Sequence, residues 1–317
     1  MRILNRILRL TVRRRLERGE FSEAMIRASR ARLNRMGARL ARRKAGQVEY
    51  LERALGGVPT IWTLPKLARD PLTQEDSETP VVLYCHGGGY LVGSPGAWRG
   101  ITANLAAASH AAIAAIDYAL APERPYPAAH QDALAAYRAL LDAGVEPARI
   151  AIGGDSAGGN LALATLHNIR AARLPMPSGA VLLSPWLDLT SGSPSIQTLA
   201  DHEAMLPPGR LSEAASHYAG DAPLASAEIS PLFGDQHGLP PLTLHVGAHE
   251  VLRDDSRRLR EQIDTAGGEI DYHEWPHAPH VFPAFADVIP EGAAAMRQIG
   301  GWLQTRFAAA TTDEASG

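Results

Sequence analysis

The sequence predicts an α/β fold in which helices cover both faces of a mostly parallel sheet. Three observations support this prediction. Short apolar runs alternate with alanine-rich helical stretches from about residue 59 onward. The apolar runs are continuous, as in strands that are buried on both faces. Two of these runs end in glycine-rich segments, at the place where parallel sheets form their binding sites.

The alternation predicts the elements in order. A strand is expected where a short apolar run lies between turn residues, and a helix where ten or more residues are rich in alanine and leucine. We expect strands at residues 81–84, 112–118, 150–153, 180–184, 242–247 and 270–275. We expect helices at residues 100–109, 131–143, 161–172, 211–218, 256–266 and 293–307.

Two segments interrupt this pattern. Residues 190–240 are rich in proline, serine and aspartate, which predicts an insertion over the site, with residues 190–225 as its core. Residues 1–50 precede the alternation and form a basic helical segment. The catalytic core is therefore expected to comprise residues 51–189 and 226–317.

Composition limits the possible classes of protein. Of the 317 residues, 45% are hydrophobic and 21% are charged, which is an ordinary globular balance. No apolar run approaches the length of about 18 residues that a transmembrane helix needs. An apolar secretory core is also absent, so we expect a cytoplasmic location. The single cysteine, Cys85, excludes an intrachain disulfide and gives no support to a zinc site.

The charge is distributed unevenly along the chain. Residues 1–45 contain 15 basic and 3 acidic residues, whereas the remainder contains 16 basic and 31 acidic residues. Apolar residues recur at helical spacing in this basic segment: Ile3, Ile7 and Leu10, then Leu33, Met36 and Leu40. We expect this segment to pack on the acidic body of the same chain. Peripheral contact with an anionic membrane, or with an acidic partner, is the alternative. No motif favours nucleic acid.

The second glycine-rich segment, Gly153-Gly154-Asp155-Ser156-Ala157-Gly158-Gly159, follows an apolar run and precedes a helical stretch. In a G-x-S-x-G turn between strand and helix, the serine is held in a strained conformation with an exposed hydroxyl. Ser156 is therefore the candidate nucleophile. A plain turn with a serine cap would explain the motif if it stood alone, but His86-Gly87-Gly88-Gly89 lies about seventy residues upstream. That loop can supply backbone N–H groups to an oxyanion.

A serine nucleophile needs a base, and the base needs an orienting acid. In this arrangement the chain order is nucleophile, acid, histidine. Among 12 histidines, His280 follows the last predicted strand, where a loop could carry it over Ser156. His277 is its nearest competitor.

The acid should follow the strand at residues 242–247. Glu250 lies nearest to the end of that strand, and Asp254 is the alternative. Asp254 and Asp255 are well explained as negative charges at the start of a helix, which leaves Glu250 as the better candidate.

Three neighbours of the site have simpler roles. Asp155 lies inside the turn, where a structural hydrogen bond is expected of it. Cys85 is expected to be a small buried hydrophobic residue. His86 is expected to brace the glycine loop.

Together these motifs resemble the hormone-sensitive-lipase-like family of α/β-hydrolases, which are serine carboxylesterases, over about residues 58–305. The resemblance rests on residues 86–90, 117–123, 127–129, 154–160, 184–189, 250–256 and 280–282. Within the family, the chain is similar to bacterial short-chain esterases and monoterpene ε-lactone hydrolases. It implies an α/β-hydrolase fold with a helical cap built from the N-terminal segment and the insertion. The chain departs from the family at Ala119, where relatives carry arginine, at Val281, where many carry glycine, and at Glu250, where many carry aspartate.

The expected function is therefore hydrolysis of short- to medium-chain carboxylic esters, or of lactones, with no cofactor and no metal. Ser156 attacks the carbonyl, His280 takes its proton, and Glu250 orients the imidazole. The N–H groups of Gly88, Gly89 and Ala157 hold the oxyanion, with Gly87 as the alternative loop donor. An inactive binding protein and a peptidase on the same fold are the competing interpretations. The sequence leaves the oligomeric state open, with a dimer as one option.

Overall fold

The computed structural model describes residues 1–17, 22–44, 46–66, 68–73 and 78–314. Within them, one sheet of eight strands runs in the order β1-β2-β4-β3-β5-β6-β7-β8. The strands are β1 (Val48–Glu52), β2 (Thr60–Pro65), β3 (Val81–Cys85), β4 (Ala112–Ile116), β5 (Ile150–Asp155), β6 (Gly179–Leu183), β7 (Leu242–Gly247) and β8 (Ile270–Trp275). Strands β3 to β8 are parallel, while β1 and β2 are antiparallel additions beside β4. The predicted mostly parallel sheet is confirmed.

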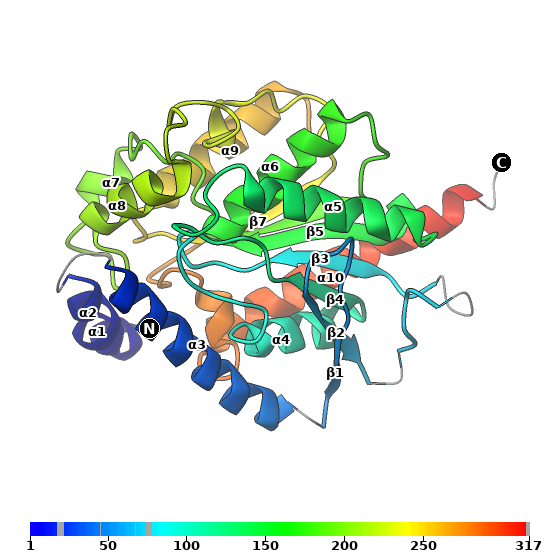
Figure 1. The fold of residues 1–317 in the computed structure, drawn as a ribbon, viewed down its shortest axis with the longest axis horizontal. Helices are drawn as coiled ribbons and strands as arrows, with labels where there is room; N and C mark the ends of the chain where they lie inside the picture. Colours follow the sequence, from blue (N-terminus) through cyan, green and yellow to red (C-terminus); the bar gives the residue numbers. More distant parts are fainter. Residues whose placement is uncertain (18–21, 45, 67, 74–77, 315–317) are drawn as a thin grey trace.

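Helices cover both faces of this sheet (Figure 1). The larger helices of the core are α4 (Arg99–Ser109), α5 (Ala128–Asp142), α6 (Ala157–Ala171), α9 (Arg253–Thr265) and α10 (Pro290–Glu314). The insertion contributes α7 (Ser195–Thr198) and α8 (Pro208–Ala219). The N-terminal segment contributes α1 (Arg2–Leu8), a π-helical turn (Arg9–Arg13), α2 (Arg14–Leu16) and α3 (Glu23–Lys44). Short 3₁₀ turns lie at Pro147–Arg149, Pro231–Phe233 and Phe282–Phe285.

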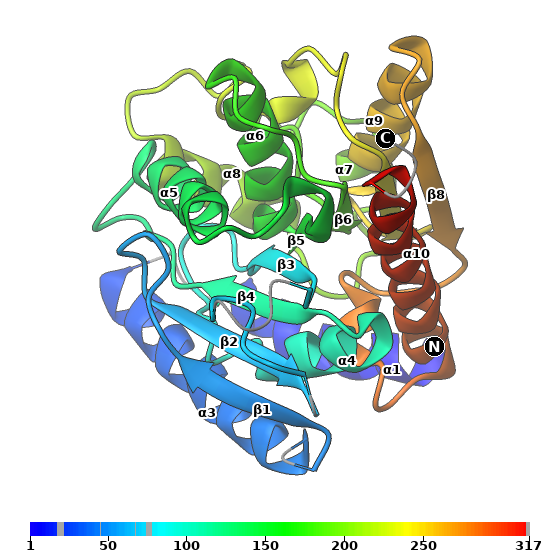
Figure 2. The ribbon, with the colours of Figure 1, turned by 90° about the vertical axis from the view of Figure 1, so that its right-hand side faces the viewer.

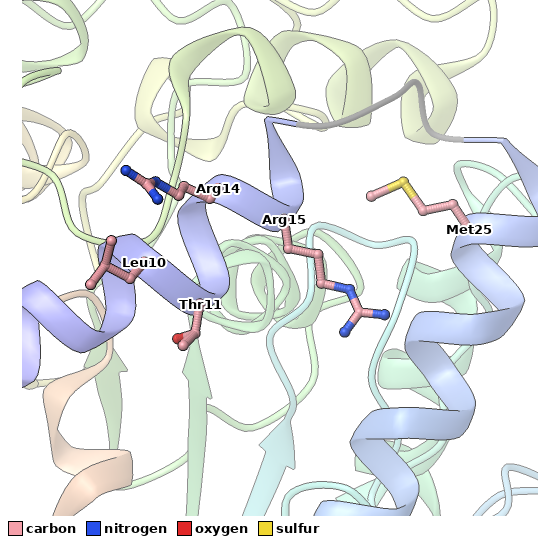
Figure 3. A pocket seen from close by; sticks show the side chains of 5 residues that line it. All are labelled: Leu10, Thr11, Arg14, Arg15 and Met25. Carbon is pink, nitrogen blue, oxygen red and sulfur yellow. The ribbon is translucent and has the colours of Figure 1, made fainter.

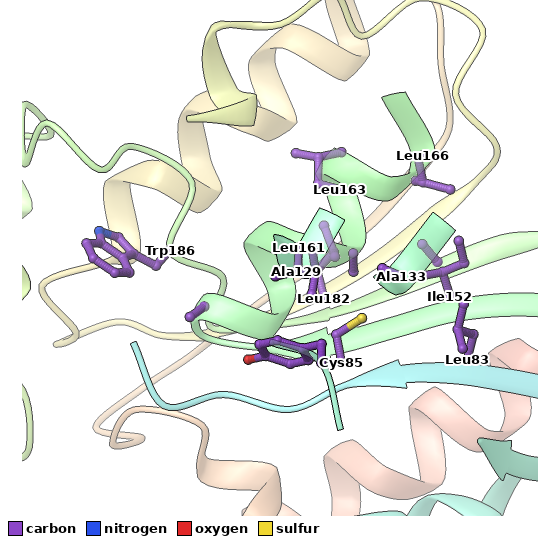
Figure 4. Close-up of a cluster of buried hydrophobic side chains, with 14 of the residues drawn as sticks. Leu83, Cys85, Ala129, Ala133, Ile152, Leu161, Leu163, Leu166, Leu182 and Trp186 are labelled. Atoms are coloured by element: carbon purple, nitrogen blue, oxygen red, sulfur yellow. The ribbon is translucent and has the colours of Figure 1, made fainter. Parts of the chain in front are cut away.

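The continuous apolar strands serve two cores, one on each face of the sheet. In β3, Leu83 and Cys85 face the core beneath α5, α6 and α9, whereas Val82 and Tyr84 face the core beneath α4 and α10. Figure 4 shows the first of these cores, where strand side chains meet Leu161 and its neighbours on α6. Because every residue of β3 is buried, alternation between polar and apolar residues is absent from the sequence of this strand.

Helix α6 begins at Ala157, earlier than the expected start at residue 161. The glycines that suggested a long turn lie inside the first turn of the helix, because the strand and the helix approach very closely there. A Cβ atom on Gly154 would lie 2.1 Å from the carbonyl oxygen of Gly158. A Cβ atom on Gly158 would lie 2.0 Å from the carbonyl oxygen of Cys85. Only glycine fits at these two positions.

The N-terminal segment lies against both the insertion and the core (Figures 1 and 2). Arg13 Nη1 donates to the carbonyl oxygens of Ala200 and Glu203 at 2.5 and 2.8 Å. On α3, Ile26 is buried, and Lys44 Nζ donates to Asn104 at 2.7 Å. None of the helices in the described ranges is both long and apolar enough to span a membrane.

Candidate active site

Ser156 occupies the single residue between β5 and α6, with φ 54° and ψ −121°. A serine with positive φ is strained, so the surrounding structure must impose this conformation. Its N–H donates to the carbonyl oxygen of Leu183 at 2.9 Å, and its own carbonyl oxygen accepts the N–H of Trp186 at 3.0 Å. The turn is thereby tied to the end of β6. The site is covered, since Ser156 is only 8% exposed.

His280 and Glu250 form a buried pair. Nδ1 of His280 lies 2.8 Å from Oε2 of Glu250, and the two residues are 4% and 1% exposed. Burial favours the neutral imidazole, but the hydrogen bond and the charge of Glu250 outweigh it, so the pKa of His280 is raised. Asp155 and Glu203 add to this rise. The N–H of Val281 donates to Ser184, and the N–H of Ser156 donates to Leu183, so the His280 loop and the Ser156 turn are both held at the end of β6.

The other oxygen of the Glu250 carboxylate is also occupied. Oε1 accepts the Ser184 hydroxyl at 2.7 Å and the Gly247 N–H at 2.5 Å. The alternative acid, Asp254, instead pairs with Arg253 at 2.9 Å and with Arg257 at 3.8 Å. The structure therefore places Glu250, and not Asp254, against the histidine.

The competing histidine, His277, lies elsewhere. Its Nδ1 is 3.3 Å from Nδ1 of His249, and its backbone carbonyl oxygen accepts a hydrogen bond from Asn5. Val281 follows His280 with φ 50° and ψ 42°, a conformation that is unfavourable for a β-branched residue. The Val281 N–H donates to Ser184 Oγ at 3.0 Å, which holds the turn in place. A glycine at this position would adopt the same turn without strain.

The first glycine-rich segment forms a loop after β3, with φ 124° at Gly88 and 63° at Gly89. Among the described residues, none accepts a hydrogen bond from the N–H of Gly88, Gly89 or Ala157. These three groups are therefore free to bind an anion, and Ala157 adds the favourable dipole of the N-terminus of α6. The alternative donor, Gly87, is already used, because its N–H donates to Asp155 Oδ1 at 3.1 Å.

Asp155 holds this loop beside the serine turn. Its Oδ1 accepts the Tyr84 hydroxyl and the Trp98 indole N–H, both at 2.8 Å, in addition to the Gly87 N–H. Burial raises the pKa of Asp155 to about 6 despite these donors. Nδ1 of His86 lies 2.8 Å from the Gly87 carbonyl oxygen, and the His86 ring stacks on Tyr118. Burial lowers the pKa of His86 to about 4, so the ring is neutral near pH 7.

Asp255 lies in the first turn of α9, as the sequence predicts, and it is also buried. It is 1% exposed, and its Oδ2 accepts the N–H groups of Leu187 and Asp188 at 2.8 and 3.0 Å. Its Oδ1 accepts the Ser193 hydroxyl. Burial raises the pKa of Asp255 to about 7. Asp255 anchors the chain where it leaves the core for the insertion, because three donors in residues 187–193 bind its carboxylate.

Ala119 stands where relatives carry arginine, and other side chains hold this segment. The Ala119 N–H donates to Asp132 at 2.8 Å. Arg30 of α3 donates to the carbonyl oxygens of Leu91 and Ala121 and pairs with Glu123 at 2.8 Å.

Two residues beside the candidate triad carried no role in the sequence analysis. Ser184 lies at the end of β6, so its place after a strand was a usable signal. Glu203 lies within the insertion and is 1% exposed, with Oε2 accepting the Val251 N–H at 3.1 Å. Nothing in the sequence near residue 203 pairs it with residue 251. Within the described ranges, no group of three His, Cys, Asp or Glu side chains could hold a metal ion.

Known proteins resemble this chain in sequence and in fold. Residues 82–284 match the family described as alpha/beta hydrolase fold. An acetyl-hydrolase from Streptomyces hygroscopicus is 41% identical over 232 residues, which cover 73% of this chain and 77% of that protein. An esterase from Acinetobacter venetianus is 36% identical over 231 residues, covering 73% and 76%.

Solved structures agree with the sequence comparisons. The crystal structure of a hormone-sensitive lipase from a metagenome library superimposes with a TM-score of 0.86 at 36% identity, covering 96% of this chain and 98% of that one. The crystal structure of EstE5 soaked with p-nitrophenyl butyrate also has a TM-score of 0.86, at 34% identity, with 96% and 97% covered.

Proposed function

This chain belongs to the α/β-hydrolase fold family and is a carboxylic ester hydrolase of the hormone-sensitive-lipase-like type, and from that premise we propose that it cleaves short- to medium-chain esters through Ser156, His280 and Glu250. The observation that carries the proposal is the buried His280–Glu250 pair, at 2.8 Å, beside the strained turn that bears Ser156. The acetyl-hydrolase and esterase names of the relatives support a small acyl group.

The proposed reaction begins when Ser156 Oγ attacks the ester carbonyl and its proton passes to Nε2 of His280. The Glu250 carboxylate accepts a hydrogen bond from the Nδ1–H of His280, which fixes the tautomer and stabilises the imidazolium that forms. The imidazolium then protonates the leaving alcohol. Water repeats the cycle on the acyl-enzyme, with His280 again as the base, and the carboxylic acid is released.

The negative charge of the tetrahedral intermediate needs donors that are not already occupied. The N–H groups of Gly88, Gly89 and Ala157 meet this requirement, whereas Gly87 is engaged with Asp155. Loss of one such donor typically costs about 3 kcal/mol of transition-state stabilisation. Asp155 supports the donors indirectly, because it joins the glycine loop to the serine turn.

The cap is proposed to consist of the N-terminal helices and residues 190–225. Contacts between the two segments support this division. Arg13 donates to Glu203 in the insertion, and Arg210 of α8 donates to the carbonyl oxygen of Leu16 at 2.6 Å. A cap of this kind would define the space for the acyl and alcohol groups.

A series of p-nitrophenyl esters from acetate to palmitate tests the proposed substrate class, with γ- and ε-lactones as a second arm. We expect the highest kcat/KM between acetate and hexanoate and a steep fall beyond about C10. Ser156→Ala should abolish hydrolysis in both arms while the protein stays folded. Activity on palmitate above that on butyrate, or on lactones but not on linear esters, would contradict the proposal.

A further inference from the structure

Glu203 is a buried carboxylate that is held by backbone N–H groups. Its Oε1 accepts the N–H groups of Met205 and Leu206 at 2.7 and 3.3 Å, and its Oε2 accepts that of Val251 at 3.1 Å. Among the described residues, no basic side chain forms an ion pair with it. Burial without an opposite charge is unfavourable for a carboxylate. Burial of the Glu203 carboxylate at this cost indicates a role beyond packing.

The neighbour that Glu203 contacts points to that role. Val251 directly follows Glu250, so the hydrogen bond from its N–H fixes the backbone that carries the proposed triad acid. The carboxylate also acts on His280 through its charge, as Glu250 and Asp155 do. These three carboxylates come from the insertion, from the loop after β7 and from the end of β5.

The segment that carries Glu203 is itself held by the N-terminal helices. Arg13 Nη1 donates to the carbonyl oxygens of Ala200 and Glu203 at 2.5 and 2.8 Å. Arg9 donates to the carbonyl oxygen of Asp201. A chain of contacts therefore runs from the basic N-terminal segment, through the insertion, to the backbone beside Glu250.

We propose that Glu203 is a positioning residue that fixes the Glu250 loop and, through its negative charge, stabilises the imidazolium of His280. Its carboxylate reaches the triad from the cap, so the cap contributes to the chemistry as well as to the enclosure. This inference rests on the proposed function, because it assigns a task only within a triad that uses His280 as the base.

Glu203→Gln removes the charge and keeps the size of the side chain, and Asp201→Asn is the matched control. Asp201 is an exposed acid on the same segment, two residues away. The measurement is the pH dependence of kcat/KM for p-nitrophenyl butyrate between pH 5 and 9. The acid limb of this profile reports the pKa of the base in the free enzyme. Loss of a nearby negative charge lowers the pKa of His280, so the limb should move to lower pH by about half a unit or more.

We also expect kcat at the optimum to fall by about 3- to 10-fold in Glu203→Gln, with little change in KM. Glu203→Asp should keep the limb at its original pH, because it keeps the charge. A folded Glu203→Gln enzyme with an unmoved limb would overturn the inference, as would an equal shift in Asp201→Asn. If Glu203→Gln does not fold, Arg13→Met decides instead, and an unchanged kcat in that variant would count against the coupling. Absence of hydrolysis in the wild-type enzyme would contradict the proposed function itself.

A second inference concerns the outer face of the N-terminal helices. Ile3, Ile7 and Leu10 are 79%, 50% and 48% exposed, and their spacing places them on one side of the helical segment. Arg6, Arg14 and Arg15, also exposed, lie among and beside them. A hollow next to this stripe is lined by Leu10, Thr11, Arg14, Arg15 and Met25, and Figure 3 shows the side chains of Arg15 and Met25 extending into the space between the first helical segment and the start of α3.

We infer that this face docks on an anionic membrane, with Ile3, Ile7 and Leu10 inserting among the lipids. Charge complementarity favours this occupant, because 15 of the first 45 residues are basic and only 3 are acidic. An exposed apolar stripe flanked by arginine is the pattern of a helix that lies in the plane of an interface.

The test is sedimentation with vesicles of phosphatidylcholine containing 30% phosphatidylglycerol, and with pure phosphatidylcholine. We expect binding to the anionic vesicles, weakened by salt, and at least about 10-fold weaker binding for the triple variant Ile3→Ser, Ile7→Ser, Leu10→Ser. Val288→Ser is the matched control, because Val288 is 72% exposed outside this segment. Equal binding by the triple variant, or no binding by the wild type, would overturn the inference. A dimer that the triple variant abolishes would assign the face to a second copy instead.

Discussion

The Ser184 hydroxyl donates a hydrogen bond to one oxygen of Glu250 at 2.7 Å, while the other oxygen of that carboxylate faces His280. The same hydroxyl oxygen accepts the N–H of Val281, directly after the histidine. Ser184 therefore links the end of β6 to both loops that carry the proposed acid and base. The side chain of Ser184 therefore restrains the positions of both loops.

Ser184→Ala should lower kcat about 10-fold with little change in KM. A hydrogen bond to a charged group contributes about 1.5–3 kcal/mol, and its loss frees both the carboxylate and the following loop. Steady-state kinetics on p-nitrophenyl butyrate measures the effect. Ser178→Ala is the control, since Ser178 Oγ donates to the carbonyl oxygen of Ile150, and Ser178 lies before β6, at the end of the strand opposite to Ser184. Similar kcat values in the two variants would argue against a positioning role for Ser184.

His280→Ala should reduce kcat by about 1,000-fold or more, whereas His277→Ala should remain close to the wild type. The reason is that only His280 contacts Glu250, while His277 faces His249. Both variants are compared by kcat on the same ester and by circular dichroism to verify folding. Mild and equal losses would show that neither histidine is the base.

Asp255 should make stability depend on pH. Burial raises the pKa of Asp255 to about 7, above its ordinary value, so the folded state holds a proton that the unfolded chain releases. Its contribution to the free energy of unfolding is complete below about pH 4 and is lost as the pH rises through about 7. Asp255→Asn mimics the protonated form, so the variant should gain stability relative to the wild type between pH 4 and 8. Urea unfolding at several pH values measures this difference, and a difference independent of pH would contradict the assignment.

Deletion of residues 1–45 should lower the Tm by about 5 °C or more and alter the preference for acyl length. The deletion removes the buried Ile26 and the Arg30 guanidinium that holds the backbone at Leu91 and Ala121. Thermal unfolding and the ester series test both effects. Arg30→Met isolates the second contribution and should reproduce part of the loss. A truncated enzyme with unchanged Tm and ester profile, but without vesicle binding, would leave the segment with a membrane role only.

The fold class and the order of the core elements could be predicted from sequence because they depend on local periodicity. The strands β1 and β2 were missed, since they join the sheet only through the antiparallel pairing of β2 with β4, which lies about fifty residues further along the chain. The predicted start of α6 at residue 161 was too late, because close packing between β5 and α6 overrides the low helix propensity of Gly158 and Gly159. The carboxylesterase activity followed from motifs that are short and contiguous.

Parts of the candidate site could not be predicted without the tertiary structure. Ser184 contacts Glu250, which lies 66 residues further along the chain. Glu203 contacts Val251, which lies 48 residues further along. No sequence motif links the members of either pair. Asp255 lies in the first turn of α9 as predicted, but its burial could not be predicted, because helix position alone does not determine burial and residues 187–193 cover this end of α9. Gly87 and Gly88 are equivalent as sequence, and only the bond from the Gly87 N–H to Asp155 separates them.

Covalent labelling with diethyl p-nitrophenyl phosphate tests the central assignment most directly. The reagent transfers its phosphoryl group to an activated serine and releases p-nitrophenol. Intact-mass and peptide analysis should find one diethylphosphoryl group, on the peptide that contains Ser156, together with loss of esterase activity. His280→Ala should label much more slowly, and Ser156→Ala should not label. A group mapped to another residue, or full esterase activity in labelled protein, would contradict the proposed triad.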